Sequence, residues 1–265
     1  TGPRNFKDPR NSLYIKYWEF IRDYSPDFFV IENVSGIAGL YGGKVREDII
    51  NKFSSLSYEV ADELVLVADY GVPQLRRRMF FVGFKKKFGK FKFPLKTHDA
   101  NNYVSCEDAI GDLPGREKDF GEEEDQYSMK PFSKYQKIMR GDSSRLFNHI
   151  ASKHTELVKD VIKQVPEGGN HKDLPPGVGE SRKFNEAWTR YHSKKPSRTI
   201  DTGHRNHFHY KWDRVPTIRE NARLQSFPDK FRFFGTKTQQ NRQVGNAVPP
   251  MFAKILASHI LSHLS

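Results

Sequence analysis

Glu32 is the carboxylate whose position in the sequence best suits chemistry. It lies near the end of residues 28–34 (FFVIENV), an apolar run with aromatic and β-branched side chains. Such a run predicts a central parallel strand that is buried on both faces. Ligands in open α/β sheets bind beyond the carboxyl ends of these strands, so Glu32 is predicted to present its carboxyl group at such a site. A helix cap or an internal ion pair is the structural alternative for this side chain.

Basic residues form a second candidate set. Gln74, Arg76 and Arg78 alternate in a segment between two predicted strands, which would place guanidinium groups at the edge of a sheet. Residues 76–96 contain nine basic residues and no acidic one, with phenylalanines between them. This pattern predicts strands with one basic and one apolar face, as in the wall of a groove that binds a polyanion.

Histidines and a cysteine could also take part in chemistry. His204, His207 and His209 lie close together, but no Cys or carboxylate stands at ligand spacing, so no metal site is predicted. Cys106 is the only cysteine, cannot form an internal disulfide and is interpreted as structural.

The composition describes a globular protein with a polyanionic partner. Lysine and arginine number 44 and aspartate and glutamate 32, which gives a net charge of +12 and favours nucleic acid. Hydrophobic residues make up 36% of the 265, and no apolar run approaches the ~18 residues of a membrane helix. We therefore expect no membrane contact, and a single cysteine fits a reducing cytoplasm.

Hydrophobic periodicity and turn residues predict an α/β protein. A helix capped by Asn11 or Ser12 should precede the strand with Glu32. Thr217 and Glu220 have the spacing of a capping box, so another helix should begin there. The remaining predictions are helices ending at Ile21 and spanning 45–56 and 251–264, strands at 58–67 and 79–84, an irregular region at 93–197, and a loop at 245–250.

Four segments resemble, in the family's order, the signatures of the C5-cytosine DNA methyltransferases. The matching segments are residues 32–34 (ENV), 74–78 (QxRxR), 219–229 (RExARLQxFPD) and 243–250 (QVGNAVPP). A long stretch separates the second from the third, where the family places its target-recognition domain. Several matches in one order are hard to obtain by chance.

The resemblance implies part of a methyltransferase-type, Rossmann-like α/β sheet with a second, irregular target-recognition domain. The implied parts are a catalytic half at 1–92, the recognition domain at 93–210 and a closing segment at 211–265. The implied reaction is methylation at C5 of a cytosine flipped out of a specific duplex sequence, as in bacterial restriction-modification systems. The residues implied to contact the cofactor, S-adenosylmethionine, are Asn246, Ala247 and Val248.

The resemblance also assigns roles to the candidate residues. Glu32 would stabilise negative charge on the cytosine ring after a thiolate adds at C6. Arg78 would hold the flipped base and the acid, and Arg76 would shape the catalytic pocket. Such an enzyme is expected in the cytoplasm, associated with the nucleoid. The residues expected to bind double-stranded DNA are Arg10, Gln74, Arg77, Lys85, Lys86 and Lys87.

The sequence departs from the family in its first third. It has no Pro-Cys pair and no Gly-rich cofactor loop after an initial strand. We therefore expect the chain to need a complementary N-terminal polypeptide or segment, and to be inactive alone. A non-catalytic DNA-binding specificity subunit and a tRNA-directed relative are the alternatives. Retention of Glu32, Arg76 and Arg78 favours the enzyme over the binding module, and the long recognition region suits duplex DNA better than tRNA.

Overall fold

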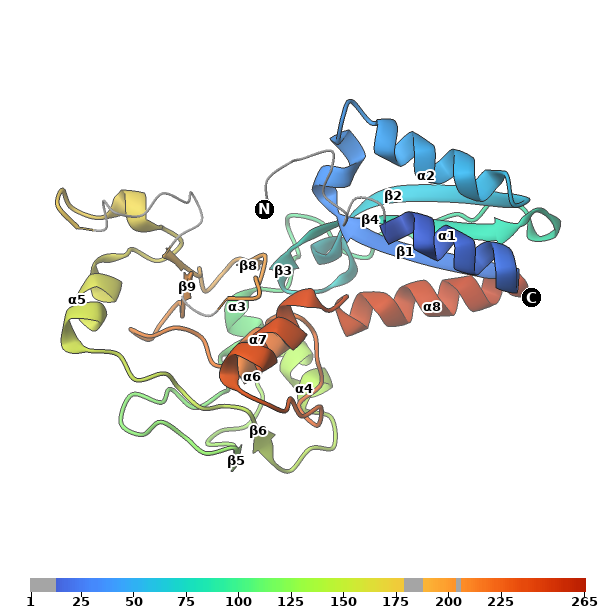
Figure 1. The fold of residues 1–265 in the computed structure, drawn as a ribbon. Helices are drawn as coiled ribbons and strands as arrows, with labels where there is room; N and C mark the ends of the chain where they lie inside the picture. Colours follow the sequence, from blue (N-terminus) through green and yellow to red (C-terminus); the bar gives the residue numbers. More distant parts are fainter. Residues whose placement is uncertain (1–12, 179–187, 204–205) are drawn as a thin grey trace. The chain divides into compact units, whose positions relative to one another are not determined.

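The chain is organised in two compact units. The computed structural model describes residues 13–178, 188–203 and 206–265. One unit consists of residues 13–65, 77–95 and 255–265, and the other of residues 66–76 and the described part of 96–254. The closing helix α8 (Pro250–Leu264) begins in the second unit and ends in the first (Figure 1). Most of the segment 211–265 therefore groups with residues of the proposed recognition region.

The first unit is built on a three-stranded sheet (Figure 1). Its middle strand is β4 (Arg77–Lys85), which lies between β1 (Phe28–Val34) and β2 (Tyr58–Leu66). β1 pairs antiparallel with β4, with Phe28 opposite Phe84 and Val34 opposite Arg78. Within the described residues, β1 therefore lies at the edge of the sheet, and the prediction of a central parallel strand is wrong for its pairing with β4. An apolar run indicates that a strand is buried, but it does not indicate which strand pairs with it or in which direction.

Helices cover both faces of this sheet. On one face, α1 (Leu13–Tyr24) and α2 (Lys44–Ser54) bury Ile21 and Phe53 against Phe29. Phe84 lies on the opposite face, where its ring contacts that of His263 in α8 at a centroid distance of 4.5 Å. The predicted helices and strands of this unit are confirmed to within a few residues at their ends.

The middle strand is apolar on both sides. Residues 79–84 of β4 are all buried. Basic side chains instead flank the strand, with Arg77 at its start and Lys85 at its end, followed by a 3-10 turn, η4 (Lys86–Phe88). The predicted alternation of basic and apolar faces is therefore wrong, because a strand covered by helices on both faces has no solvated side.

Short helices and two-stranded sheets make up the second unit. Their bounds are η3 (Val67–Tyr70), β3 (Gln74–Leu75), α3 (Cys106–Ile110), β5 (Glu124–Asp125), α4 (Lys134–Arg140), β6 (Leu146–Phe147), α5 (Glu156–Gln164), η5 (His171–Asp173), β7 (Thr189–Arg190), β8 (Ser197–Arg198), β9 (His207–Phe208), α6 (Ile218–Leu224) and α7 (Lys237–Asn246). β3 pairs with β8 and β7 with β9, both parallel, whereas β5 and β6 are antiparallel. Long connecting segments join these elements, as the irregular pattern predicts.

α6 and α7 form the centre of this unit. Every residue of α6 is buried, and its predicted capping box is confirmed: the Thr217 side chain accepts from the N–H of Glu220, and the Glu220 carboxylate accepts from that of Thr217. α7 is not predicted from the sequence and begins at a second capping box, Thr236 with Gln239. The predicted loop at 245–250 is therefore wrong for its first two residues, which end α7.

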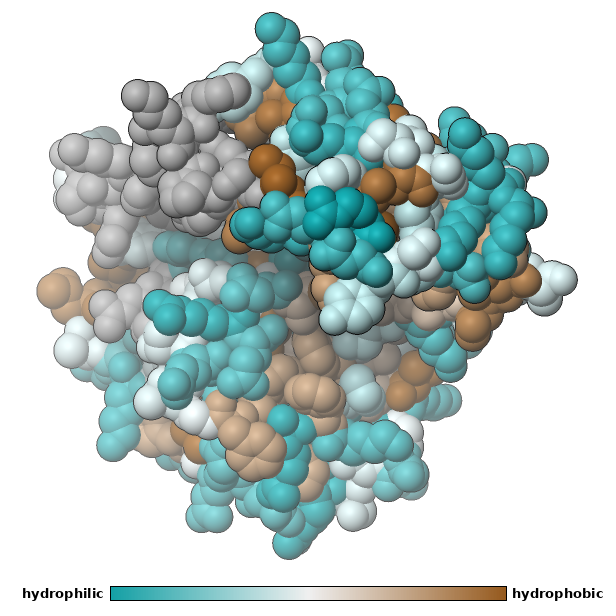
Figure 2. Space-filling model, turned by 45° about the vertical axis from the view of Figure 1, so that its right-hand side comes forward, coloured by the Kyte–Doolittle hydropathy of each residue, from teal (hydrophilic) through white to brown (hydrophobic). Residues whose placement is uncertain are grey.

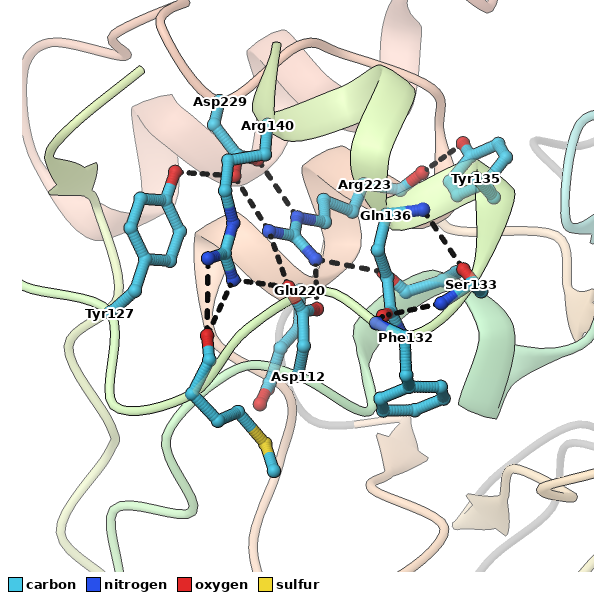
Figure 3. A network of polar contacts seen from close by, with 12 residues as sticks. Asp112, Tyr127, Phe132, Ser133, Tyr135, Gln136, Arg140, Glu220, Arg223 and Asp229 are labelled. Atoms are coloured by element: carbon cyan, nitrogen blue, oxygen red, sulfur yellow. Dashed lines mark hydrogen bonds and ion pairs between the residues drawn. The ribbon is translucent and has the colours of Figure 1, made fainter. Parts of the chain in front are cut away.

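Arg223 of α6 is part of a buried polar network (Figure 3). Its guanidinium donates to Asp229 at 2.8 and 2.6 Å and also to Asp112. Arg140 pairs with Asp112, and the hydroxyl of Tyr127 donates to Asp229 at 2.6 Å. Burial alone would raise the pKa of Asp229, but the hydrogen bonds and charge of Arg223 outweigh it and lower that pKa. This part of the 219–229 motif therefore serves the interior of the unit.

Glu220 anchors a second buried network. Arg214 donates to both of its carboxylate oxygens, at 2.8 and 2.6 Å. Burial would raise the pKa of Glu220, but Arg214 outweighs burial and lowers it. Burial lowers the pKa of His149 to about 4 and that of His209 to about 3, so both imidazoles are neutral at pH 7. His209 Nε2 lies 3.5 Å from Glu220 and is not part of an ion pair at that pH.

One face of the molecule is drawn in Figure 2. On the face drawn in Figure 2, hydrophilic residues (teal) predominate, and hydrophobic residues (brown) lie in smaller groups between them. Among the described residues, no helix combines the length and the apolar character that crossing a membrane requires.

Candidate functional site

Glu32 and Arg78 meet on adjacent strands of the first unit. Because Arg78 is opposite Val34, it is the diagonal neighbour of Glu32 on one face of the sheet. Arg78 Nε lies 3.0 Å from Glu32 Oε1, and the two side chains are 17% and 27% exposed. Burial lowers the pKa of Arg78, and the Glu32 carboxylate partly opposes that shift. The pair is therefore partly desolvated and still open to a ligand.

The pair retains polar atoms that a ligand can use. Arg78 Nη1 donates to the carbonyl oxygen of Arg77 at 2.8 Å. Within the described residues, neither Arg78 Nη2 nor Glu32 Oε2 forms a hydrogen bond. A guanidinium beside a carboxylate can bind a planar ligand that offers an acceptor next to a donor.

Gln74 and Arg76 lie in the second unit and are almost fully buried, at 0% and 1% exposure. Arg76 Nη2 donates to the carbonyl oxygens of Gly245 at 3.0 Å and Ala247 at 3.3 Å. Gln74 Oε1 accepts from the N–H of Ile200 at 3.0 Å. Both side chains therefore hold backbone groups of their own unit. Gln74 has no exposed surface with which to contact DNA directly.

The end of α7 and the two residues after it, Ala247 and Val248, have one exposed edge. Asn246 is exposed, and Ala247 and Val248 are half-buried. Gly245 approaches the backbone of Asp201 so closely that an added Cβ would lie 2.3 Å from its carbonyl oxygen. Glycine is therefore required at the inner side of this edge, and Asn246 can reach a ligand at its outer side.

Gln225 is a residue of this region that the sequence analysis does not assign. Its Nε2 donates to the carbonyl oxygens of Val244 at 3.1 Å and Ala247 at 2.7 Å, and its Oε1 accepts from Gln74. The one sequence clue is its place in the 219–229 motif. That motif does not say which of its polar side chains face a site and which face the interior.

The basic residues predicted to bind DNA differ in their availability. Arg77 and Lys86 are exposed. Lys85 and Lys87 lie 3.8 and 3.1 Å from the carboxylate of Asp27, which partly neutralises them. Exposed pairs of this kind are weak, so a polyanion can still compete for both lysines.

The remaining sequence candidates are buried or lie outside the described residues. Cys106 is buried at the start of α3, and burial raises the pKa of its thiol well above its usual range. His207 and His209 are buried too. Where the chain is described, no group of three His, Cys, Asp or Glu side chains could hold a metal ion. Arg10 and His204 lie outside the described residues.

Several known proteins are similar to this chain in sequence. The family model for C-5 cytosine-specific DNA methylase matches residues 2–262. Type II methyltransferase M1.HphI of Haemophilus parahaemolyticus is 38% identical over 258 residues, covering 96% of this chain and 62% of that relative. Type II methyltransferase M.DdeI of Desulfomicrobium norvegicum is 35% identical over 285 residues, covering 98% and 69%. The chain thus spans between 62% and 69% of the length of these two relatives.

Solved structures share the fold. A protein of E. coli described as a DNA modification methyltransferase encoded within a prophage matches with a TM-score of 0.79 and 26% identity, over 97% of this chain and 75% of that one. The Entamoeba histolytica methyltransferase EhMeth matches with a TM-score of 0.57 at 14% identity, over 97% and 70%. The predicted α/β methyltransferase fold is confirmed.

Proposed function

The chain belongs to the C-5 cytosine-specific DNA methylase family, and we propose that it takes part in the S-adenosylmethionine-dependent methylation of cytosine C5 in a specific duplex DNA sequence. Its relatives M1.HphI and M.DdeI are type II methyltransferases, so we propose a bacterial restriction-modification system as its setting. The observation that carries the proposal is the partly exposed pair of Glu32 and Arg78. A module that only binds DNA has no need of a carboxylate at a site for a planar ligand.

Glu32 is proposed to stabilise charge on the cytosine ring. Addition of a thiolate at C6 makes C5 nucleophilic and puts negative charge on the ring. A carboxyl group that hydrogen-bonds N3 and the exocyclic amine would stabilise that charge. Arg78 holds the carboxylate at 3.0 Å, and its Nη2 can donate to the base. The cytosine must leave the helix to reach the pair, at a cost of a few kcal/mol.

Asn246, Ala247 and Val248 are proposed to contact the cofactor. Arg76 and Gln225 bind the carbonyl oxygens of this segment on its inner side, while Asn246 is exposed on the outer side. A segment whose backbone is fixed by hydrogen bonds and whose Asn246 amide is exposed fits a ligand with polar groups along its length. When bound, S-adenosylmethionine supplies the methyl group. Arg76 is then a positioning residue, because its guanidinium is buried against the backbone.

The thiol that attacks C6 is proposed to come from polypeptide that this sequence does not contain. Cys106 is the only cysteine, has 0% exposure, and has a thiol whose pKa is raised by burial. It is therefore neither accessible nor ionised at neutral pH. We expect no methyl transfer from the chain alone, and transfer once a thiol-bearing segment is supplied.

Double-stranded DNA is proposed to contact both units. In the first, Arg77 and Lys86 are exposed and can reach phosphates. Residues 93–210 are proposed as the target-recognition domain, between the catalytic segments 1–92 and 211–265. The proposed site of action is DNA of the nucleoid, in the cytoplasm.

Glu32→Gln tests the proposal in an assembly that is competent for methyl transfer. The amide keeps the shape and one acceptor for Arg78, but it cannot supply a proton, so the single-turnover rate should fall by roughly 10²-fold or more. DNA affinity should change little. The melting temperature should also change little, because the amide fills the same space and keeps an acceptor for Arg78. Glu59→Gln, on a half-buried position of β2, is the matched control and should leave the rate unchanged.

Two results would redirect the assignment. An unchanged rate per folded molecule with a lowered melting temperature would return Glu32 to a structural role. If the wild-type assembly binds DNA but transfers no methyl group, the non-catalytic specificity subunit becomes the better description.

A further inference from the structure

Two buried glutamines lie next to residues 246–248, which we call the cofactor edge because they are proposed to contact the cofactor. Gln74 comes from β3 and Gln225 from the end of α6, and both have 0% exposure. Gln74 Oε1 accepts from the N–H of Ile200 at 3.0 Å. Its Nε2 donates to Gln225 Oε1 and, at 3.2 Å, to the carbonyl oxygen of Leu224. Gln74 is thus bound to backbone on one side and to Gln225 on the other.

Gln225 forms the next hydrogen bonds of this series, to the backbone of the cofactor edge and of Val244. Its Nε2 donates to the carbonyl oxygens of Val244 at 3.1 Å and Ala247 at 2.7 Å. Arg76 donates to Ala247 as well, at 3.3 Å. The backbone at Ala247 is therefore held by two buried side chains.

The backbone groups at the two ends fix the direction of this series. The N–H of Ile200 can only donate, so the oxygen of Gln74 must face it. The Gln74 nitrogen then faces Gln225 and selects the Gln225 oxygen. The Gln225 nitrogen is left to face the carbonyl oxygens of Val244 and Ala247, which can only accept. No other orientation of the two amides satisfies every group.

We propose that Gln74 and Gln225 form a positioning relay for the cofactor edge, in which Gln74 sets the orientation of the Gln225 amide and Gln225 fixes the backbone at Ala247. Gln74 thereby acts at a distance, through Gln225. The cofactor part of this inference rests on the proposed function of residues 246–248. The relay itself rests on the hydrogen bonds and the burial of the two glutamines.

Gln74→Glu reverses the relay at its far end without changing the shape of the side chain. The introduced carboxylate still accepts from Ile200, but its second oxygen opposes the oxygen of Gln225. Gln225 must turn over or lose that contact, and turning over sets its oxygen against the carbonyls of Val244 and Ala247. A protonated carboxyl has an O–H that can donate to Gln225, so low pH should restore the relay.

Hydrogen exchange of peptides covering residues 243–251 in the full chain measures this effect. At about pH 8 we expect exchange at least ~10-fold faster in Gln74→Glu than in wild type, with the difference shrinking toward about pH 5. Gln74→Met leaves no oxygen opposite Gln225, so it should loosen these peptides less than the isosteric change. Gln126→Glu adds the same charge at an exposed position and should have no effect.

Three results would overturn the relay. The first is a smaller rise in hydrogen exchange for Gln74→Glu than for Gln74→Met, and the second is a rise that does not depend on pH. The third is a rise spread evenly over the peptides of the second unit. Loss of packing alone would produce each of these results. In a Gln225→Met background, Gln74→Glu should add nothing to the exchange rate, and an undiminished effect would contradict transmission through Gln225. Protection of the wild-type peptides by S-adenosylmethionine tests the cofactor contact separately. Lack of protection would refute that contact, while the variants still decide the relay.

Discussion

Replacing Arg223 by methionine should destabilise the second unit strongly. The change removes the guanidinium that pairs with Asp112 and Asp229, both of which have 0% exposure. Breaking a buried ion pair from one side typically costs about 3–5 kcal/mol, because a charge is left uncompensated. Arg140 still pairs with Asp112 and Tyr127 still donates to Asp229, so we expect about 3 kcal/mol. At roughly 2–4 °C per kcal/mol, the melting temperature should fall by about 6–12 °C.

Thermal unfolding of the purified chain provides the assay, and Arg145→Met is its matched control. Arg145 is 49% exposed in its pair with Glu124, so its loss should cost at most about 1 kcal/mol. Adding Asp229→Asn to Arg223→Met should recover part of the loss, because it removes a buried carboxylate whose remaining cation, Arg219, lies at 3.9 Å. A melting temperature for Arg223→Met within about 2 °C of wild type would refute this reasoning.

Two further predictions concern pH and salt. His149 and His209 have pKa values lowered to about 4 and 3, so between these values and about 6.5 the unfolded state binds more protons and stability falls as pH falls. Melting at pH 7 and pH 5 should show a loss of up to about 2 kcal/mol for each histidine, and a flat profile would contradict their burial as neutral groups. Lys86→Ala should reduce the slope of log affinity for DNA against log salt by up to about 0.9. Lys87→Ala should reduce it less, because Asp27 already lies 3.1 Å from that lysine, and equal effects would argue against this difference.

The sequence predicts helices and strands well where apolar residues carry the pattern, and poorly elsewhere. Residues 28–34 are a strand, as their apolar run indicates, but the antiparallel pairing with β4 depends on contacts that the run does not encode. α7 escapes prediction because only Val244 and Gly245 supply buried apolar positions among its polar residues. Thr236 and Gln239 were the available clue, since they have the same capping-box spacing that revealed the start of α6.

The candidate site was predictable as a set of residues and in the contact between Arg78 and Glu32, but not in its other contacts. The resemblance predicts that Arg78 holds the acid, and the β1–β4 register, with Arg78 opposite Val34, brings the two side chains into contact. The resemblance groups Gln74 with residues that bind DNA, yet its burial leaves the amide only internal partners. Motifs identify polar residues that matter, whereas burial decides whether each one faces a ligand or the interior.

The QxRxR segment illustrates how three closely spaced side chains serve two compact units. Gln74 and Arg76 belong to the second unit, where they bind Gln225 and the backbone at Ala247. The chain passes into the first unit at residue 77, and Arg78 pairs with Glu32 on the sheet. Arg76 therefore contacts the proposed cofactor edge, whereas Arg78, two positions further along the chain, belongs to the proposed base-binding pair. Alternate spacing in this motif therefore does not mean a shared contact, because Gln74 and Arg76 hold backbone groups whereas Arg78 pairs with Glu32.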